Sequence, residues 1–286
     1  MTSHDRWLIA LDIDGTLLTN HGDVAPEVSS EVTRVFEAGH EVMLATGRSW
    51  AETAPVIEAL NISPEYVVCS NGAMVLKKDA LADRGYRREY VETFNPASVL
   101  TTIRPALPEG TFAVEDANGA YYYTESFPYV SQMHEAHQVD FDELMHREVT
   151  RVVVISPSDD TEAFLQVVEK MGLHRVTYNI GYTAWLDIAP DGVNKATGLE
   201  KVREHLGIPR SRVFAAGDGR NDIEMLEWAA KLGRGVAMEG SSAHPFLSTD
   251  SPTPWRASSW HIFAGARISP RHRQPLRSRT VGSDSL

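Results

Sequence analysis

Apolar runs of strand length alternate with segments of helical period at both ends of this 286-residue chain, and this alternation limits the possible folds more than any other feature. The run WLIALDI at residues 7–13 precedes a segment in which Pro26 stands where a first helical turn would begin and Gly39 stands where that helix would end. Further strands are predicted at 41–46 and 66–70. The alternation is typical of a parallel sheet with helices on both faces.

The pattern changes between about residues 74 and 188, where short turns rather than helices separate the strands. In FAVEDANGAYYY, the pair Asn118-Gly119 between two β-rich runs predicts a type I′ hairpin. Helical segments are expected near 95–106, 139–147 and 159–171, so the insert reads as α+β with an antiparallel sheet. In the segment MHEAH the two histidines are spaced by three rather than by the four of a zinc-protease helix, and we expect a polar helix there.

The βα alternation resumes after Pro190, so we predict one discontinuous domain with an insertion. The expected class is α/β, with a Rossmann-like parallel-sheet core formed by residues 1–83 and 190–240 and an inserted α+β domain at 84–189. Residues 241–286 are rich in proline and arginine and lack lysine, which predicts a poorly ordered tail. We hypothesise that the reading frame or the chain end is altered in this tail.

Composition excludes several classes of partner. The chain has 27 Lys+Arg against 39 Asp+Glu, a balance that argues against nucleic acid or an anionic membrane as the partner. The N-terminus lacks the basic and apolar regions of a signal peptide, and no apolar stretch reaches the roughly 18 residues of a membrane span. Cys69 stands alone in an apolar run, which excludes an internal disulfide. We therefore expect a cytoplasmic protein, and any phosphate that it handles should be small and neutralised by a metal ion.

Two carboxylates follow the first predicted strand, in the motif DIDGT. Like charges placed together at a strand end are costly to desolvate, so a cation is expected near Asp12 and Asp14. We expect the two side chains to point apart, so that they can take different roles, and Mg²⁺ with its preference for oxygen ligands would offset their charge. A plain Asp/Gly turn is the alternative; a calcium loop is excluded because Gly15 comes fourth rather than sixth.

Phosphate-binding side chains are predicted at two further places. The second strand runs into ATGRS, which brings the Thr46 hydroxyl, the Gly47 backbone and the Arg48 guanidinium to the same edge of the sheet. Lys195 stands at the predicted start of a helix, where its charge can neutralise phosphate oxygens. Taken separately, each could be an ordinary turn or surface residue.

A third strand, RVFAAGD, ends in GDGRND. Asp218 stands at the strand end, and Asn221 and Asp222 open the next helix. These oxygen-bearing side chains can complete a metal site. A helix-capping role for Asn221 or Asp222 is compatible with that interpretation.

The four motifs DIDGT, ATGRS, Lys195 and GDGRND, in this order at the strand ends of one sheet, resemble those of the haloacid dehalogenase (HAD) superfamily. The insertion between SNGA at 70–73 and LDIAPDGVNK at 186–195 is similar to that of the Cof-type phosphatases, which carry a C2B-like α+β cap at this place. The resemblance spans residues 7 to about 240. From Ser241 onward the sequence departs from the family pattern.

The resemblance implies a role for each motif residue. Asp12 would be the nucleophile and Asp14 the general acid and base. The implied phosphate-binding residues are Thr46, Gly47, Lys195 and Asn221, and further substrate contacts would come from Arg48 and Asn71. Mg²⁺ would be held by Asp12, the Asp14 backbone carbonyl and Asp218, with Asp222 as a direct or indirect ligand.

The expected activity is Mg²⁺-dependent hydrolysis of a phosphomonoester on a small metabolite, such as a sugar phosphate, through an aspartyl-phosphate intermediate. Alternatives are a phosphomutase or a dedicated sugar-phosphate phosphatase on the same core, or a non-catalytic phospholigand-binding or regulatory protein. The presence of both Asp12 and Asp14 argues against the last, because a binding module needs no acid and base. The patterns assign neither an individual substrate nor an oligomeric state.

Overall fold

The computed structural model describes residues 5–18, 22–125, 127, 135–156, 161–171, 176–180, 185–238 and 241–243. Its centre is a four-stranded sheet in the order β13-β12-β1-β2, in which every neighbouring pair is parallel. The strands are β1 (Leu8–Leu11), β2 (Glu41–Leu44), β12 (Val213–Gly217) and β13 (Arg234–Ala237). The predicted α/β class with a Rossmann-like parallel-sheet core is confirmed.

Helices cover both faces of this sheet because successive side chains of each strand point to opposite sides. Ile9 and Leu11 pack in one apolar cluster with residues of α1 (Pro26–Glu37) and α2 (Trp50–Ala59). Leu8 and Ala10 pack in a second cluster with residues of the helices α6 (Lys195–His205) and α7 (Ile223–Ala230). As predicted, α1 begins with Pro26, and Gly39 follows its end with a φ of 87°.

A three-stranded antiparallel sheet extends the core beyond β2. It consists of β3 (Tyr66–Cys69), β4 (Met74–Lys78) and β5 (Tyr86–Val91), and a parallel bridge between Ala45 and Val68 joins it to the end of β2. Within the described residues of the core, the short 3-10 helices are η2 (Ser70–Gly72), η3 (Asp83–Gly85), η5 (Arg210–Arg212) and η6 (Arg220–Asp222). Because β5 pairs with β4, we propose that the core continues past the predicted limit at residue 83 to Val91.

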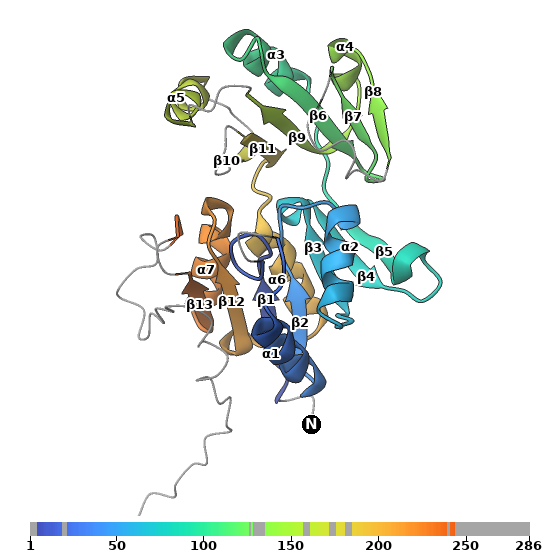
Figure 1. Cartoon of the computed structure of the whole chain (residues 1–286), viewed down its shortest axis with the longest axis vertical. Coiled ribbons are helices and arrows are strands. Elements are labelled where there is room, and N and C mark those ends of the chain that lie inside the picture. The colour runs from blue at the N-terminus through green and yellow to red at the C-terminus, as the bar shows by residue number, and fades with distance from the viewer. Residues whose placement is uncertain are drawn as a thin grey trace, which may run out of the picture.

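A second lobe, the cap, lies above the core in Figure 1 and is built on a six-stranded sheet in the order β10-β11-β9-β6-β7-β8. Its strands are β6 (Thr111–Asp116), β7 (Tyr121–Tyr123), β8 (Ala136–Gln138), β9 (Val149–Ile155), β10 (Val176–Ile180) and β11 (Trp185–Pro190). All pairs are antiparallel except β7 with β8. The cap helices are α3 (Ala97–Ala106), α4 (Phe141–Leu144) and α5 (Thr161–Met171). They pack on the sheet through a core that includes Leu100, Phe112 and Val152.

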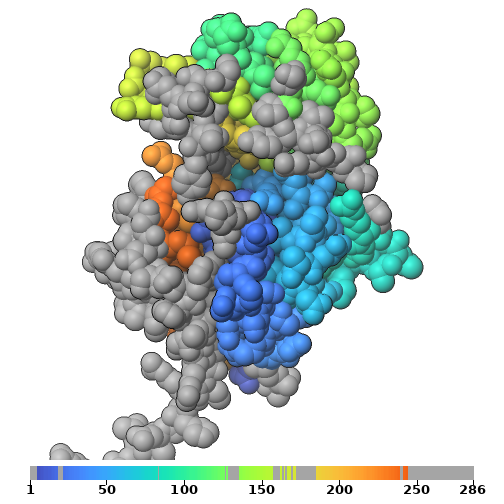
Figure 2. Space-filling view, in the orientation of Figure 1, coloured from blue at the N-terminus to red at the C-terminus, as the bar shows by residue number. Residues whose placement is uncertain are grey.

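The space-filling view shows the cap residues, in green and yellow, stacked on the blue and cyan residues of the core (Figure 2). None of the helices in the described ranges is long and apolar enough to cross a bilayer.

The hairpin predicted around Asn118-Gly119 is confirmed, because β6 pairs antiparallel with β7, but its turn type and one helix prediction in the cap were wrong. A type I′ turn needs positive φ at both central residues, but of the two only Gly119 has it, with a φ of 83°. The Asp116 carboxylate accepts the N–H groups of Asn118 and Ala120, and these hydrogen bonds stabilise a different turn. In MHEAH we expected a helix, yet Ala136–Gln138 is the strand β8, held by its pairing with β7. Met133 and His134 lie outside the described residues.

The start of the predicted tail contacts the core. Ala243 is buried, and its N–H donates to the Asp218 carbonyl at 3.0 Å, which the Ser242 hydroxyl also reaches at 3.1 Å. Residues 244–286, on which the rest of the prediction of a poorly ordered tail depends, lie outside the described residues.

Candidate active site at the ends of the core strands

Asp12 and Lys195 form a buried ion pair at the carboxyl end of β1. Asp12 directly follows the strand, and its N–H donates to the Ala216 carbonyl of β12, so the sheet fixes its backbone. Lys195 is the first residue of α6 and directly follows Asn194, the N-cap residue of that helix. Its side chain is 0% exposed, and its Nζ lies 2.6 Å from Asp12 Oδ1 and 2.7 Å from Asp222 Oδ1.

Asp218 and Asp222 come from the loop after β12. The Thr16 hydroxyl donates to Asp218 Oδ1 at 3.2 Å. Asp222 Oδ2 accepts the N–H groups of Asp218 at 3.0 Å and Gly219 at 2.8 Å. Since Asp222 Oδ1 already accepts a hydrogen bond from Lys195, both oxygens are engaged, which favours a positioning role for this carboxylate.

The carboxylates of Asp12, Asp218 and Asp222 could hold a metal ion, because each offers an oxygen within 4.8 Å of the others and all three are buried. Gly15 brings its backbone so close that a Cβ would lie 2.2 Å from Asp218 Oδ2. One ammonium faces three carboxylates, so negative charge is in excess. An all-oxygen, anionic set of this kind fits Mg²⁺.

Electrostatics at the site follow from burial and this charge excess. Burial, and next the charge of Asp222, raise the pKa of Asp12 well above its ordinary value, although Lys195 acts in the opposite direction. Burial opposes the charge of Lys195, but the carboxylates of Asp12 and Asp222 outweigh it and raise the lysine pKa. The lysine is therefore charged at neutral pH, and a further cation would favour the ionised form of Asp12.

Asp14 lies in the turn after β1, and its side chain points away from this buried group, as expected. Its side chain is 57% exposed, and the guanidinium of Arg48 holds both of its oxygens, with Nε 2.8 Å from Oδ2 and Nη2 2.5 Å from Oδ1. The hydrogen bond to Asp14 raises the pKa of Arg48. One of the two aspartates is thus buried beside a lysine, and the other faces solvent.

The phosphate-binding candidates Thr46, Gly47 and Asn221 come from two separate segments that meet at Asn71. Asn71 N–H donates to the Thr46 carbonyl at 3.0 Å, and the Asn221 amide donates to Asn71 Oδ1 at 3.0 Å. Gly47 packs closely here, since a Cβ on it would lie 3.2 Å from the Asn71 side chain. Asn71 has a φ of 52°, a left-handed conformation that concentrates at functional sites.

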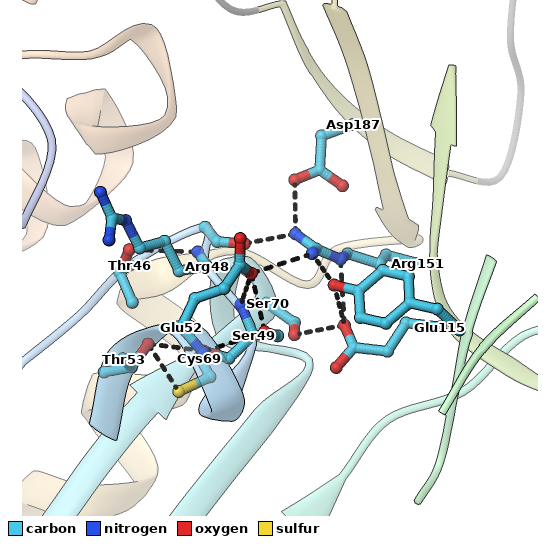
Figure 3. Close-up of polar contacts among 12 residues, drawn as sticks. Thr46, Arg48, Ser49, Glu52, Thr53, Cys69, Ser70, Glu115, Arg151 and Asp187 are labelled. Carbon is cyan, nitrogen blue, oxygen red and sulfur yellow. Dashed lines mark hydrogen bonds and ion pairs between the residues drawn. The ribbon is translucent and has the colours of Figure 1, made fainter. Parts of the chain in front are cut away.

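Two cap residues that the motifs did not predict contact the phosphate-binding candidates and Asn71. Arg151 on β9 and Asp187 on β11 are buried, and Arg151 Nη1 donates to the Gly47 carbonyl at 2.5 Å. Figure 3 shows Arg151 between Asp187, Glu115 and the core residues around Ser70. A signal existed, because Arg151 and Asp187 are charged residues inside apolar strand runs, VTRVVVI and WLDIAP.

Comparison with known families gives a match over most of the chain. The family model described as haloacid dehalogenase-like hydrolase matches residues 9–247.

Two curated relatives are similar along most of their length. The 5-amino-6-(5-phospho-D-ribitylamino)uracil phosphatase YitU of Bacillus subtilis is 28% identical over 81% of this chain and 86% of its own. An HMP-PP phosphatase of Serratia proteamaculans is 27% identical over 81% of this chain and 83% of its own.

Solved structures share the fold. The HAD subclass IIB sugar phosphatase BT4131 superposes with a TM-score of 0.67 at 19% identity, covering 83% of this chain and 89% of that one. The phosphatase BT1666 of Bacteroides thetaiotaomicron superposes with a TM-score of 0.63 at 26% identity, covering 85% of this chain and 87% of that one.

Proposed function

The chain belongs to the haloacid dehalogenase-like hydrolase family and is a phosphatase of the HAD type, and we propose that it hydrolyses the phosphomonoester of a small metabolite with Mg²⁺ and through an aspartyl-phosphate. The observation that carries the proposal is the buried Asp12 carboxylate, held 2.6 Å from the Lys195 ammonium and followed two residues later by the exposed Asp14. Nucleophile and proton carrier thus occupy two different environments on one loop.

In the first step the Asp12 carboxylate attacks phosphorus, and the bond between phosphorus and the leaving oxygen breaks. Asp14 delivers a proton to that oxygen, so that the metabolite leaves as an alcohol. Lys195 supplies fixed positive charge next to the nucleophile and to the phosphoryl oxygens as the charge moves. The ion pair between Arg48 and Asp14 has to open for this proton transfer, which frees the guanidinium for the substrate.

In the second step a water molecule attacks the phosphorus of the aspartyl-phosphate. Asp14 takes the proton of that water, the bond between phosphorus and Asp12 breaks, and orthophosphate leaves with the Asp12 carboxylate restored. Thr46, the Gly47 backbone and Asn221 would hold the phosphoryl oxygens in both steps, because they provide hydroxyl and N–H donors at the same edge of the sheet.

Asp12, the Asp14 carbonyl and Asp218 would hold Mg²⁺, with Asp222 orienting the group through its hydrogen bonds to the backbone. When bound, the ion supplies positive charge that offsets the carboxylates and the phosphate. The names of the relatives support a small phosphorylated substrate, since one acts on a phosphoribitylamino compound and BT4131 is called a sugar phosphatase. We also propose a cytoplasmic location, on the sequence grounds given above.

The test is hydrolysis of an aryl phosphate by the purified protein, with Mg²⁺ and with a chelator. We expect turnover that needs Mg²⁺ and is lost in Asp12→Asn, while Asp142→Asn, the same change on an exposed cap helix, keeps the wild-type rate. Turnover that persists in Asp12→Asn would overturn the covalent mechanism. Dependence on a bisphosphate would indicate a phosphomutase, and phosphate binding without turnover would indicate a binding protein.

A further inference from the structure

A chain of polar contacts runs from the cap into the phosphate-binding segments of the core. Arg151 Nη1 is 2.5 Å from the Gly47 carbonyl oxygen and 3.4 Å from Asp187 Oδ2. Asp187 Oδ2 accepts the Asn71 amide at 3.0 Å, and Asn71 Oδ1 accepts the Asn221 amide at 3.0 Å. Two cap residues thereby connect the motif ATGRS with the motif GDGRND, which follow different strands of the core.

The first link fixes one peptide unit from both sides. The Gly47–Arg48 peptide presents its carbonyl oxygen to Arg151, and its N–H donates to Thr46 Oγ1 at 3.1 Å. A peptide unit is planar, so holding both ends fixes its orientation. Because Thr46 Oγ1 accepts this N–H, its own hydrogen is directed elsewhere and can serve a phosphoryl oxygen.

Arg151 is itself held in one position. Its guanidinium forms an ion pair with Glu115, with Nε 3.0 Å from Oε2, and the same Oε2 accepts the Ser70 hydroxyl at 2.9 Å (Figure 3). Its Nη2 contacts the Tyr121 hydroxyl. Burial disfavours its charge, but Tyr121 and then Asp187 and Glu115 outweigh this and raise the pKa of Arg151. A charged, planar group with partners on each side cannot turn without losing several of them.

We propose that Arg151 and Asp187 are positioning residues of the phosphatase reaction, through which the docked cap orients the Gly47–Arg48 peptide and the Asn71–Asn221 pair for phosphate binding. The proposal rests on the proposed function of the same site. Neither side chain needs to touch the reacting atoms. The phosphate site is complete only when the cap supplies these two groups, so binding of phosphate and docking of the cap favour each other.

The test compares Arg151→Met, Arg151→Lys, Asp187→Asn and the double variant Arg151→Met/Asp187→Asn, using an aryl phosphate whose leaving group has few atoms for the cap to contact. Arg151→Met should lower kcat by about 10- to 100-fold, the range expected when a binding group moves by up to an ångström. Arg151→Lys should lie between it and the wild type, because an ammonium can reach Gly47 or Asp187 but cannot span both as the guanidinium fork does.

The double variant separates positioning from independent contributions. If the two residues act as one chain, the double variant loses no more than the worse single variant, whereas independent effects would multiply. The matched control is Arg104→Met, whose guanidinium lies within the cap over the rings of Phe112 and Phe141; it should keep the wild-type kcat. A folded Arg151→Met protein with wild-type kcat would overturn the proposal. A double variant whose loss of kcat equals the product of the two single losses would overturn it as well.

Orthophosphate binding in Mg²⁺ is measured on the same proteins by calorimetry. It should weaken by at least about tenfold in Arg151→Met if the peptide orientation matters. An inactive wild type would count against the proposed function, and the orthophosphate affinities would then decide the positioning role alone. If Arg151→Met does not fold, the isosteric Asp187→Asn and the charge-preserving Arg151→Lys provide the same comparison.

Discussion

Replacing Lys195 with methionine tests the charge balance at the centre of the site. The lysine side chain is fully buried, and its Nζ is 2.6 Å from Asp12 Oδ1 and 2.7 Å from Asp222 Oδ1. Methionine has a similar length and a good helix propensity, so the substitution removes the charge without opening a large cavity. What remains is a pair of buried carboxylates without their shared cation.

We expect the free energy of unfolding of chelator-treated Lys195→Met to fall by about 3–5 kcal/mol, the usual effect of removing one partner of a buried ion pair. Two carboxylates lose the same cation, which favours the upper part of this range. The Asp222 carboxylate is less affected by the loss of the lysine charge than Asp12, because its Oδ2 still accepts the N–H groups of Asp218 at 3.0 Å and Gly219 at 2.8 Å. Asp12→Asn added to Lys195→Met should therefore regain part of the loss.

The assay is urea unfolding at pH 7, followed by circular dichroism, on the wild type, both single variants and the double variant. Turnover should be absent in all three variants, so stability and activity are read separately. A Lys195→Met protein within about 1 kcal/mol of the wild type would refute the reasoning, since that is the ordinary effect of a point mutation. A double variant less stable than Lys195→Met would refute it as well, because the orphaned Asp12 charge would then not be the cause.

Two smaller perturbations follow from the same structure. Gly15→Ala would place a Cβ 2.2 Å from Asp218 Oδ2, whereas Gly22→Ala has nothing within 4 Å, and φ is similar at 76° and 83°. Both variants should lose about 1 kcal/mol or more of stability, because alanine is strained in the left-handed backbone conformation. Only Gly15→Ala should need a higher Mg²⁺ concentration for half-maximal turnover. Equal Mg²⁺ requirements in the two variants would contradict the proposed metal site. Hydrogen bonds from Arg203 lower the pKa of Glu200 from its ordinary value of 4.5 to about 2, so this carboxylate stabilises the fold above pH 4.5 and loses that effect as the pH falls toward 2. Glu200→Gln, at a partly exposed site, should cost about 0.5–1 kcal/mol in urea unfolding at pH 7 and less at pH 3; an equal cost at both pH values would contradict the assignment.

The core of the site could be predicted from the sequence because its residues are fixed by local rules. Asp12 and Asp218 each follow an apolar strand, and Lys195 opens a helix, so the parallel sheet alone brings them to one edge. Asp12 and Asp14 face different ways, as expected, but the reason is the turn after β1 and not strand alternation, which would place side chains two residues apart on the same face. It could not indicate that Arg48 holds Asp14, because that contact depends on side-chain geometry across two loops.

The cap contacts could not be predicted, and the physical reason is the distance along the chain. Arg151 and Gly47 are 104 residues apart and meet only because the cap sheet docks on the core. The wrong hairpin type has a local cause of another kind, since the Asp116 carboxylate accepts the N–H groups of Asn118 and Ala120, and a type I′ turn would need the Ala120 N–H for its closing hydrogen bond to the Ala117 carbonyl. Side-chain hydrogen bonds to the backbone thus override a dipeptide preference that is otherwise a strong signal.

The different surroundings of Asp12 and Asp14 explain how the chain can place two carboxylates with a single residue between them. In the proposed mechanism Asp12 has to be ionised and desolvated; burial desolvates it but raises its pKa, so the positive charge of Lys195 and of the proposed metal ion has to favour the ionised form. A proton carrier has to exchange its proton with the leaving group and then with water, which the solvent-facing Asp14 can do once Arg48 releases it. If the cap positions Gly47 through Arg151, it also constrains the neighbouring Arg48, and closure of the cap would then set both the phosphate site and the release of the general acid.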